Sequence, residues 1–233
     1  ANKLLVLVDG RAIYHPLFAG VFWDMQQLML DDLDRIEVIR GPGATVWGAN
    51  AVNGVINVVS RSARETQGGL VYGGGGDQPA LLGGVRYGGQ LGAQTFYRVF
   101  ASYRADDDSP LAGGASARDS WEGRHGGFRV DHFSAADTRL TWQADTTNVR
   151  HDHDAFTADN FNTLVRWSRP FSAAAGVEVQ AYYDRASRHE PARADTHSDT
   201  IDFTAQHMFG LGERHQIIWG GGYRYVTNRL APS

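Results

Sequence analysis

The residues best suited to metal chemistry lie in one charged stretch, His151–Asp154, which reads His-Asp-His-Asp. Histidine and carboxylate side chains together form typical transition-metal sites, and His189 and His197 stand in a second charged stretch further on. A hydrated surface loop has the same composition, and this interpretation is favoured. We therefore predict no metal site.

Asp106, Asp107 and Asp108 form a second candidate, this time for a hard cation such as Ca²⁺. The run lacks the spacing of ligands found in an EF-hand, so a solvated acidic loop is again favoured. No serine lies at a telling spacing from a histidine and an acid, as a nucleophilic site requires. The sequence therefore predicts neither an enzyme nor a bound cofactor.

Residues 35–61, RIEVIRGPGATVWGANAVNGVINVVSR, hold two β-rich runs around a segment of glycines and small residues. A phosphate-binding loop is disfavoured, because neither GxxxxGK[ST] nor GxGxxG spacing occurs between a strand and a long helix. Gly41-Pro42-Gly43 must turn the chain. The stretch predicts a compact strand–loop–strand unit.

This stretch resembles the C-terminal half of the plug domain of TonB-dependent outer-membrane receptors, and the upstream Leu4–Arg11 resembles the strand and turn that precede it. The family pattern is approximately RIEV, RGP, an aromatic-Gly pair and GVIN followed by two β-branched residues and Ser or Thr. The matching residues are Arg35-Ile36-Glu37-Val38, Arg40-Gly41-Pro42, Trp47-Gly48 and Gly54–Ser60.

The resemblance implies a receptor that takes up a scarce ligand across the outer membrane of a Gram-negative bacterium. Its partners would be outer-membrane lipid, the ligand and the energy-transducing protein TonB. A ferric siderophore is the expected ligand, with cobalamin, haem or a carbohydrate as alternatives. A passive porin-like channel or a surface adhesin built on β-strands is a further alternative, and the plug-like residues 35–61 weigh against the channel. The chain lacks a signal peptide, the TonB-contacting box and half a plug, so we expect an internal fragment.

The resemblance also places ligand contacts in the outward-facing loops of the plug. Aromatic side chains there suit a planar ligand, although packing in the small plug core explains Phe18 and Phe22 equally well. The predicted ligand-binding residues are Tyr14, His15, Trp47 and Asn50.

Arg35, Glu37 and Arg40 place charges on a predicted plug strand, where burial requires pairing. Pairing within the plug is one possibility. The favoured one is that at least one of them meets lumen-facing charges of the barrel wall, such as Glu178, Asp184 or Arg166. These three residues are the predicted plug–barrel contacts.

Composition agrees with a turn-rich β protein. The 233 residues include 28 Gly, 11% aromatic residues and no Cys, and the net charge of -4 gives no reason to expect nucleic-acid binding. No apolar run approaches the length of a membrane helix. One short helix is expected over Met25–Leu30, capped by Asp24.

From Thr66 onward the chain alternates between apolar and polar residues in segments of about ten, as expected for strands of a membrane barrel. Leu140, Trp142 and Ala144, for example, alternate with polar neighbours. The predicted strands are 66–76, 81–91, 95–105, 124–133, 138–148, 160–169, 176–187, 198–209 and 214–226.

The predicted connections alternate between short turns and long charged loops, the latter at 106–123, 149–159 and 188–197. Outer-membrane barrels have short periplasmic turns and longer extracellular loops. The fold class is therefore mainly β, with a partial plug domain at 1–64 and the first strands of an antiparallel up-and-down transmembrane β-barrel at 65–233. About nine strands would leave the barrel incomplete, with two open edges that lipid does not tolerate.

Overall fold

A computed structural model of the chain describes residues 4–15, 17, 20–43, 47, 50–134, 137–153, 155–191, 193–212 and 214–232. Over these residues the chain is mainly β, which confirms the predicted fold class. It divides into two compact units, Ala1–Ser62 and Ala63–Ser233, which we call the N-terminal and the C-terminal unit. The domain boundary at residue 64 remains a prediction.

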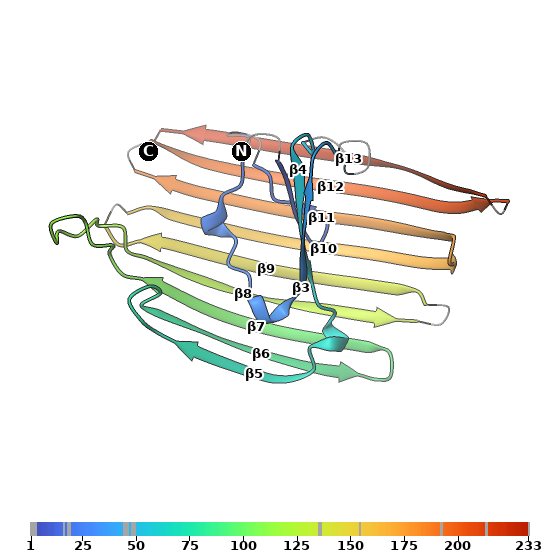
Figure 1. Ribbon diagram of the computed structural model, residues 1–233, viewed down its shortest axis with the longest axis horizontal. Coiled ribbons are helices and arrows are strands. Elements are labelled where there is room, and N and C mark those ends of the chain that lie inside the picture. Colours follow the sequence, from blue (N-terminus) through green and yellow to red (C-terminus); the bar gives the residue numbers. More distant parts are fainter. Residues whose placement is uncertain are drawn as a thin grey trace. The chain divides into compact units, whose positions relative to one another are not determined.

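Four strands form the sheet of the N-terminal unit (Figure 1). They are β1 (Leu4–Val8), β2 (Arg11–Ala12), β3 (Leu33–Arg40) and β4 (Gly54–Ser60), in the order β2-β1-β4-β3. β1 and β4 run parallel, whereas β2 pairs with β1, and β3 with β4, in antiparallel fashion. The two β-rich runs of the plug-like stretch are therefore neighbours in one sheet.

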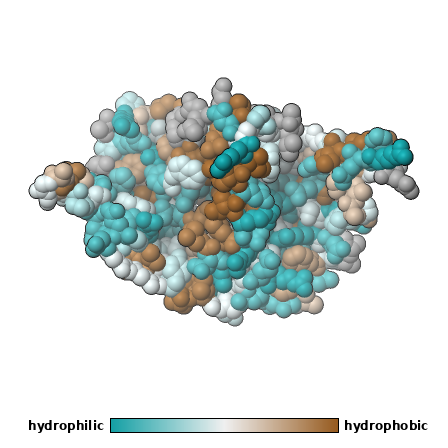
Figure 2. Space-filling view, viewed as in Figure 1, coloured by the Kyte–Doolittle hydropathy of each residue, from teal (hydrophilic) through white to brown (hydrophobic). Residues whose placement is uncertain are grey.

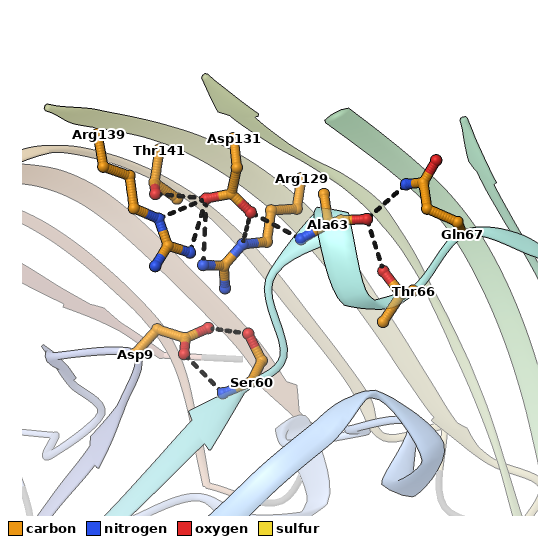
Figure 3. Close-up of polar contacts among 9 residues, drawn as sticks. All are labelled: Asp9, Ser60, Ala63, Thr66, Gln67, Arg129, Asp131, Arg139 and Thr141. Carbon is orange, nitrogen blue, oxygen red and sulfur yellow. Dashed lines mark hydrogen bonds and ion pairs between the residues drawn. The ribbon is translucent and has the colours of Figure 1, made fainter. Parts of the chain in front are cut away.

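Asp9 and Gly10 form the hairpin turn between β1 and β2, as the sequence predicts. Their φ angles are 50° and 80°, and positive φ at both central residues defines a type I′ turn, for which Asp-Gly is a favoured pair. The Asp9 carboxylate accepts hydrogen bonds from the backbone N–H of Ser60 (2.8 Å) and from its hydroxyl (2.7 Å) (Figure 3). The turn is thereby tied to the end of β4.

The core of the N-terminal unit lies against this sheet. Its buried centre consists of Leu5, Leu7, Ala51 and Val55, with Ala12, Ile39 and Trp47 packed around it. Figure 2 shows a band of hydrophobic residues at the position of this sheet. Full burial of one Leu or Val side chain contributes roughly 1.5–3 kcal/mol, so burial of this cluster stabilises the sheet.

The predicted helix over Met25–Leu30 is wrong. Two short 3₁₀ helices stand at its edges instead, η1 (Trp23–Met25) and η2 (Leu30–Asp32), and Gln26 between them has non-helical angles of φ −104° and ψ 72°. Met25 and Met29, which suggested a helical face, are both buried. An irregular segment buries the same two side chains, so their spacing was not a reliable helix signal.

The C-terminal unit begins with η3 (Ala63–Glu65) and continues as one curved sheet of nine antiparallel strands (Figure 1). Each strand pairs with its neighbours in sequence, so the topology is up-and-down as predicted. The strands are β5 (Gly68–Gly74), β6 (Leu81–Leu91), β7 (Thr95–Asp106), β8 (Trp121–Phe133), β9 (Arg139–His151), β10 (Thr157–Ser172), β11 (Ala175–Glu190), β12 (Ala194–Leu211) and β13 (His215–Ala231).

The two faces of this sheet reverse the burial pattern of a water-soluble protein. On one face, the apolar face, large hydrophobic side chains are exposed, for example Trp142 at 50% and Phe203 at 46%. On the other, the polar face, Asn162 is 1% exposed and Asp131 is fully buried. Apolar residues outside and polar residues inside are the pattern of a transmembrane barrel wall.

The predicted long loops are mostly wrong. Among the predicted long loops, residues 107–120 are a long connection between the described strands, whereas β9 ends at His151 and β10 begins at Thr157, and β11 ends at Glu190 and β12 begins at Ala194. The strands continue through most of the predicted loops 149–159 and 188–197, where polar residues still pair in the ladder, such as His189 with Asp195. The other ends are joined by short turns, as predicted.

Among the described residues, no helix has the length and apolar character needed to cross a membrane.

Candidate functional site

Tyr14 and His15, two of the predicted ligand-binding residues, lie directly after β2 in the N-terminal unit. His15 is 8% exposed, its backbone N–H donates to the Gly20 carbonyl (2.7 Å), and its ring meets that of Phe22 edge-on at 4.8 Å. Tyr14 is half-buried. His15 thus has a packing role that its sequence did not reveal, and its contact with ligand stays a prediction. Phe18 lies outside the described residues.

Trp47 and Asn50, the other two predicted ligand-binding residues, belong to the segment between β3 and β4. Trp47 packs against the core cluster, and its backbone N–H donates to the Gly43 carbonyl (2.8 Å). Asn50 has a positive φ of 75°, a conformation that Asn adopts more readily than most residues. Both side chains are half-buried, so each retains some surface for a ligand. Gly48 of the aromatic-Gly pair lies outside the described residues.

Three of the charged residues of β3, Asp34, Arg35 and Glu37, are paired within the N-terminal unit. Arg35 contacts Glu37 (Nε–Oε1, 2.7 Å) and Asp34 (Nη1–Oδ2, 2.5 Å), and the Asn57 amide donates to the second Glu37 oxygen (2.8 Å). The Arg35 and Asn57 hydrogen bonds lower the pKa of Glu37, and the contacts with Glu37 and Asp34 raise the pKa of Arg35. This is the internal pairing that the sequence left open. Contact of Arg35, Glu37 or Arg40 with the barrel stays a prediction.

The polar face of the C-terminal unit carries a buried cluster around Asp131, which we call the Asp131 cluster (Figure 3). The Asp131 carboxylate accepts from the guanidinium of Arg129 (2.9 Å), the guanidinium of Arg139 (3.0 Å), the hydroxyl of Thr141 (2.6 Å) and the backbone N–H of Ala63 (2.7 Å). Four separate donors thus converge on one carboxylate, which holds the start of η3 against β8 and β9.

Strand register explains why these side chains meet. Arg129 and Asp131 are two apart on β8 and share a face, and Asp131 lies directly opposite Thr141 of β9. Sequence reasoning missed this cluster, although a charged pair at i and i+2 within a strand was available as a signal.

The segment that follows Ala63 is fixed to the wall by further contacts. The Arg64 guanidinium lies over the rings of Phe96 (5.5 Å) and Phe133 (5.8 Å), a cation–π arrangement. The side chains of Thr66 and Gln67 donate to the Ala63 carbonyl. Residues 63–67 therefore form a compact turn that is anchored to the barrel wall.

The wall charges named as possible partners of the plug have partners within the wall itself. Arg166 donates to the Gln180 amide oxygen (2.9 Å) and lies 3.7 Å from Glu178. Asp184 accepts from the Asn160 amide (3.2 Å). The polar face is thus a network of paired side chains that can line a hydrated path.

The acidic loop of residues 107–120 is organised around Asp108. Its carboxylate accepts from the Ser116 hydroxyl and from the backbone N–H of Ser120 (2.8 Å), and the His153 ring nitrogen lies 3.1 Å from each of its oxygens. Within the described residues no group of three or more acidic, His or Cys side chains is placed to hold a metal ion, and Asp154 lies outside them. Asp108 therefore has a structural role in shaping the loop.

We expect this loop to keep its structure down to about pH 4 and to loosen below it. The Ser116 hydrogen bond, followed by that of Ser120, holds the pKa of Asp108 well below its usual range. A carboxylate whose pKa is lowered in the folded state stabilises that state fully above its unfolded pKa of about 3.9. This stabilisation is lost as the pH falls towards the pKa of the folded state. Amide hydrogen exchange of residues 107–120 at a series of pH values, corrected for intrinsic rates, measures this loosening.

Asp108→Asn should loosen the loop at pH 7, whereas Asp107→Asn is the matched control and should leave the loop unchanged. Equal protection in both variants would contradict the prediction.

The TonB-dependent Receptor Plug Domain family matches residues 1–55. Of the solved structures, the copper transporter OprC is similar over 99% of this chain, with a TM-score of 0.77 and 15% identity. The match therefore includes both the plug-like sheet and the nine-stranded wall. Residues 1–55 belong to the plug-domain family of TonB-dependent receptors, and the chain as a whole has the fold of part of such a receptor. Its expected location in the outer membrane of a Gram-negative bacterium follows from this family.

Other relatives of this receptor chain differ in the ligand that they are named for. The siderophore receptor PirA from Pseudomonas aeruginosa is similar over 98% of this chain, with a TM-score of 0.69 and 15% identity. The vitamin B12 transporter BtuB of Vibrio vulnificus is 36% identical over 76 residues, which is 33% of this chain and 12% of that protein. The chain spans about two fifths of the length of the solved receptors that it matches. The family consists of transport proteins, in agreement with the expectation that the chain is not an enzyme.

Proposed function

We propose that this chain is part of a receptor that binds a ferric siderophore from outside the cell and imports it with energy supplied through TonB. One observation carries the proposal: a plug-family sequence is followed by a nine-stranded wall with apolar side chains outside and a paired polar network inside. A polar inner wall suits a hydrated ligand path, and a separate plug unit suits gating of that path.

The partly exposed aromatic surfaces of Tyr14 and Trp47 support a planar, aromatic ligand. Catecholate groups of a siderophore have this shape, and stacking on the two rings would orient them. TonB is the proposed partner because the plug family takes its name from this dependence.

Cobalamin is the second candidate ligand, favoured by the sequence relatives, which are vitamin B12 transporters. Its corrin ring is also planar, so the same side chains serve both alternatives. A carbohydrate or haem ligand and a passive channel are left as outcomes of the test.

The test is a titration of the full-length receptor with ferric siderophores, cobalamin and haem, followed by intrinsic tryptophan fluorescence. We expect submicromolar binding of a ferric siderophore, weakened about tenfold or more by Tyr14→Ala, a loss of about 1.4 kcal/mol. Trp47→Phe keeps an aromatic ring and is the milder control. Tight binding of cobalamin alone would replace the siderophore by the second candidate.

Energy coupling is tested separately by uptake in whole cells. Import of the bound ligand should stop when the proton gradient is collapsed or TonB is deleted. Uptake that continues under both conditions would overturn the receptor proposal in favour of a passive channel.

A further inference from the structure

The apolar face of β11–β13 contains a groove that the ligand path does not use. It has a volume of about 680 Å³, and the surface that lines it is mostly apolar, although Gln206 and His207 are among its residues. Ala205 and Gly221, paired across β12 and β13, form its floor. A Cβ added to Gly221 would meet no atom within 4 Å, so the floor is open towards the membrane.

Aromatic side chains form the walls of this groove. Phe203 and Tyr223 are cross-strand partners on one side of the floor, and His207 and Trp219 are partners on the other. The Trp219 indole N–H donates to the His207 ring nitrogen (3.0 Å), and the two rings stand almost perpendicular, at 84°. Because this wall pairs the indole donor internally, it needs no polar group from an occupant.

A positive charge marks one end of the groove. Phe171 and Val177 line that end, next to the short turn between β10 and β11. Arg169 lies opposite Val177 in the strand register and is exposed, and its guanidinium stands 5.5 Å from the centre of the Phe171 ring. Short turns lie at the periplasmic end of outer-membrane barrels, so the charge lies at the membrane surface on that side.

We propose that this groove binds a glycerophospholipid of the periplasmic leaflet, with one acyl chain between the aromatic walls and the phosphate at Arg169. The groove runs from the charged end towards the middle of the strands, which is the direction of an acyl chain below its headgroup. It is continuous with the exposed apolar face of the sheet, the face that a membrane barrel turns towards lipid. The surrounding lipid is itself apolar, so selectivity must come from shape and from the phosphate contact rather than from the hydrophobic effect.

Native mass spectrometry of the full-length receptor, titrated in detergent with phosphatidylglycerol, tests the proposal. We expect one lipid to be retained by the wild type and its affinity to fall about tenfold in Arg169→Gln, the effect of one charge-assisted contact. Arg193→Gln, at an exposed turn near the other end of the strands, is the matched control and should bind as the wild type does. Diacylglycerol, which has no phosphate, should bind equally weakly to wild type and to Arg169→Gln.

Gly221→Phe, which fills the floor, should also weaken binding, whereas Val85→Phe on the same face of β6 should not. Folding of each variant is checked by its heat-dependent migration in gel electrophoresis. Arg169→Gln changes only an exposed side chain, so the test stands even if Gly221→Phe does not fold. Equal lipid retention by all variants, or occupation of this face by a second receptor copy, would overturn the proposal.

Discussion

Asp131→Ala is expected to destabilise the barrel wall by about 3–5 kcal/mol, because it leaves the guanidinium of Arg129 buried without its carboxylate. Arg129 is only 5% exposed, and its Nε lies 2.9 Å from the Asp131 carboxylate. The Ala63 N–H loses its acceptor in the same change (Figure 3). The measurement is urea unfolding of the full-length receptor, together with hydrogen exchange at Ala63, which should become faster.

Thr141→Val is the matched control for this prediction. It removes one hydrogen-bond donor from Asp131 while both guanidinium groups stay in contact with the carboxylate. The free energy of unfolding should therefore fall by only about 1 kcal/mol. If Asp131→Ala cost no more than Thr141→Val, the buried ion pair would not be what holds η3 to the wall.

Gly54→Ala is expected to disrupt the N-terminal sheet where β4 begins. Gly54 has a φ of +153°, and an added Cβ would lie 2.5 Å from the carbonyl oxygen of Ile39 in the neighbouring strand. Backbone strain of about 1–3 kcal/mol and overpacking of about 1–3 kcal/mol act together at this one position. Protease resistance of the N-terminal unit in the full-length receptor should fall, and ligand binding should fall with it.

Gly41→Ala separates the two causes. Gly41 also has a positive φ, +92°, but a Cβ there would have no atom within 4 Å. Its replacement should therefore cost only the strain of a left-handed residue, about 1–2 kcal/mol. Equal effects of Gly41→Ala and Gly54→Ala would show that the contact with Ile39 is unimportant.

The fold could be predicted from the sequence wherever a face of a strand is apolar. Alternation such as Leu140, Thr141, Trp142 identified β9, and the nine strands were predicted because each has one face towards lipid. Asp9-Gly10 predicted its turn because few pairs adopt positive φ twice. These features are local, so the sequence alone reveals them.

Features that depend on pairing at a distance were missed. The outer parts of β11 and β12 have polar residues on both faces, so alternation ends although the ladder continues, and the strands were predicted too short. The Asp131 cluster brings Ala63 to a residue 68 positions further on, which no local pattern reports. The burial of His15, a predicted ligand-binding residue, was missed for the same reason. It depends on contacts with Phe22 and Gly20 across a loop.

The length of the strands limits where the amino-acid sequence of this part of the receptor can vary. β12 has 18 residues, which at ~3.3 Å per residue and a tilt of ~45° reach a height of about 42 Å, well above the ~25 Å apolar band. The surplus is hydrogen-bonded sheet, a stiff collar outside the membrane. An inserted residue within 191–193 would shift the register of two long strands, whereas residues 107–120 lie outside the ladder of the sheet. Antibodies and phages that select for change at the cell surface would therefore find the antigenic variation of this part of the receptor mainly in residues 107–120, while the collar keeps its sequence pattern.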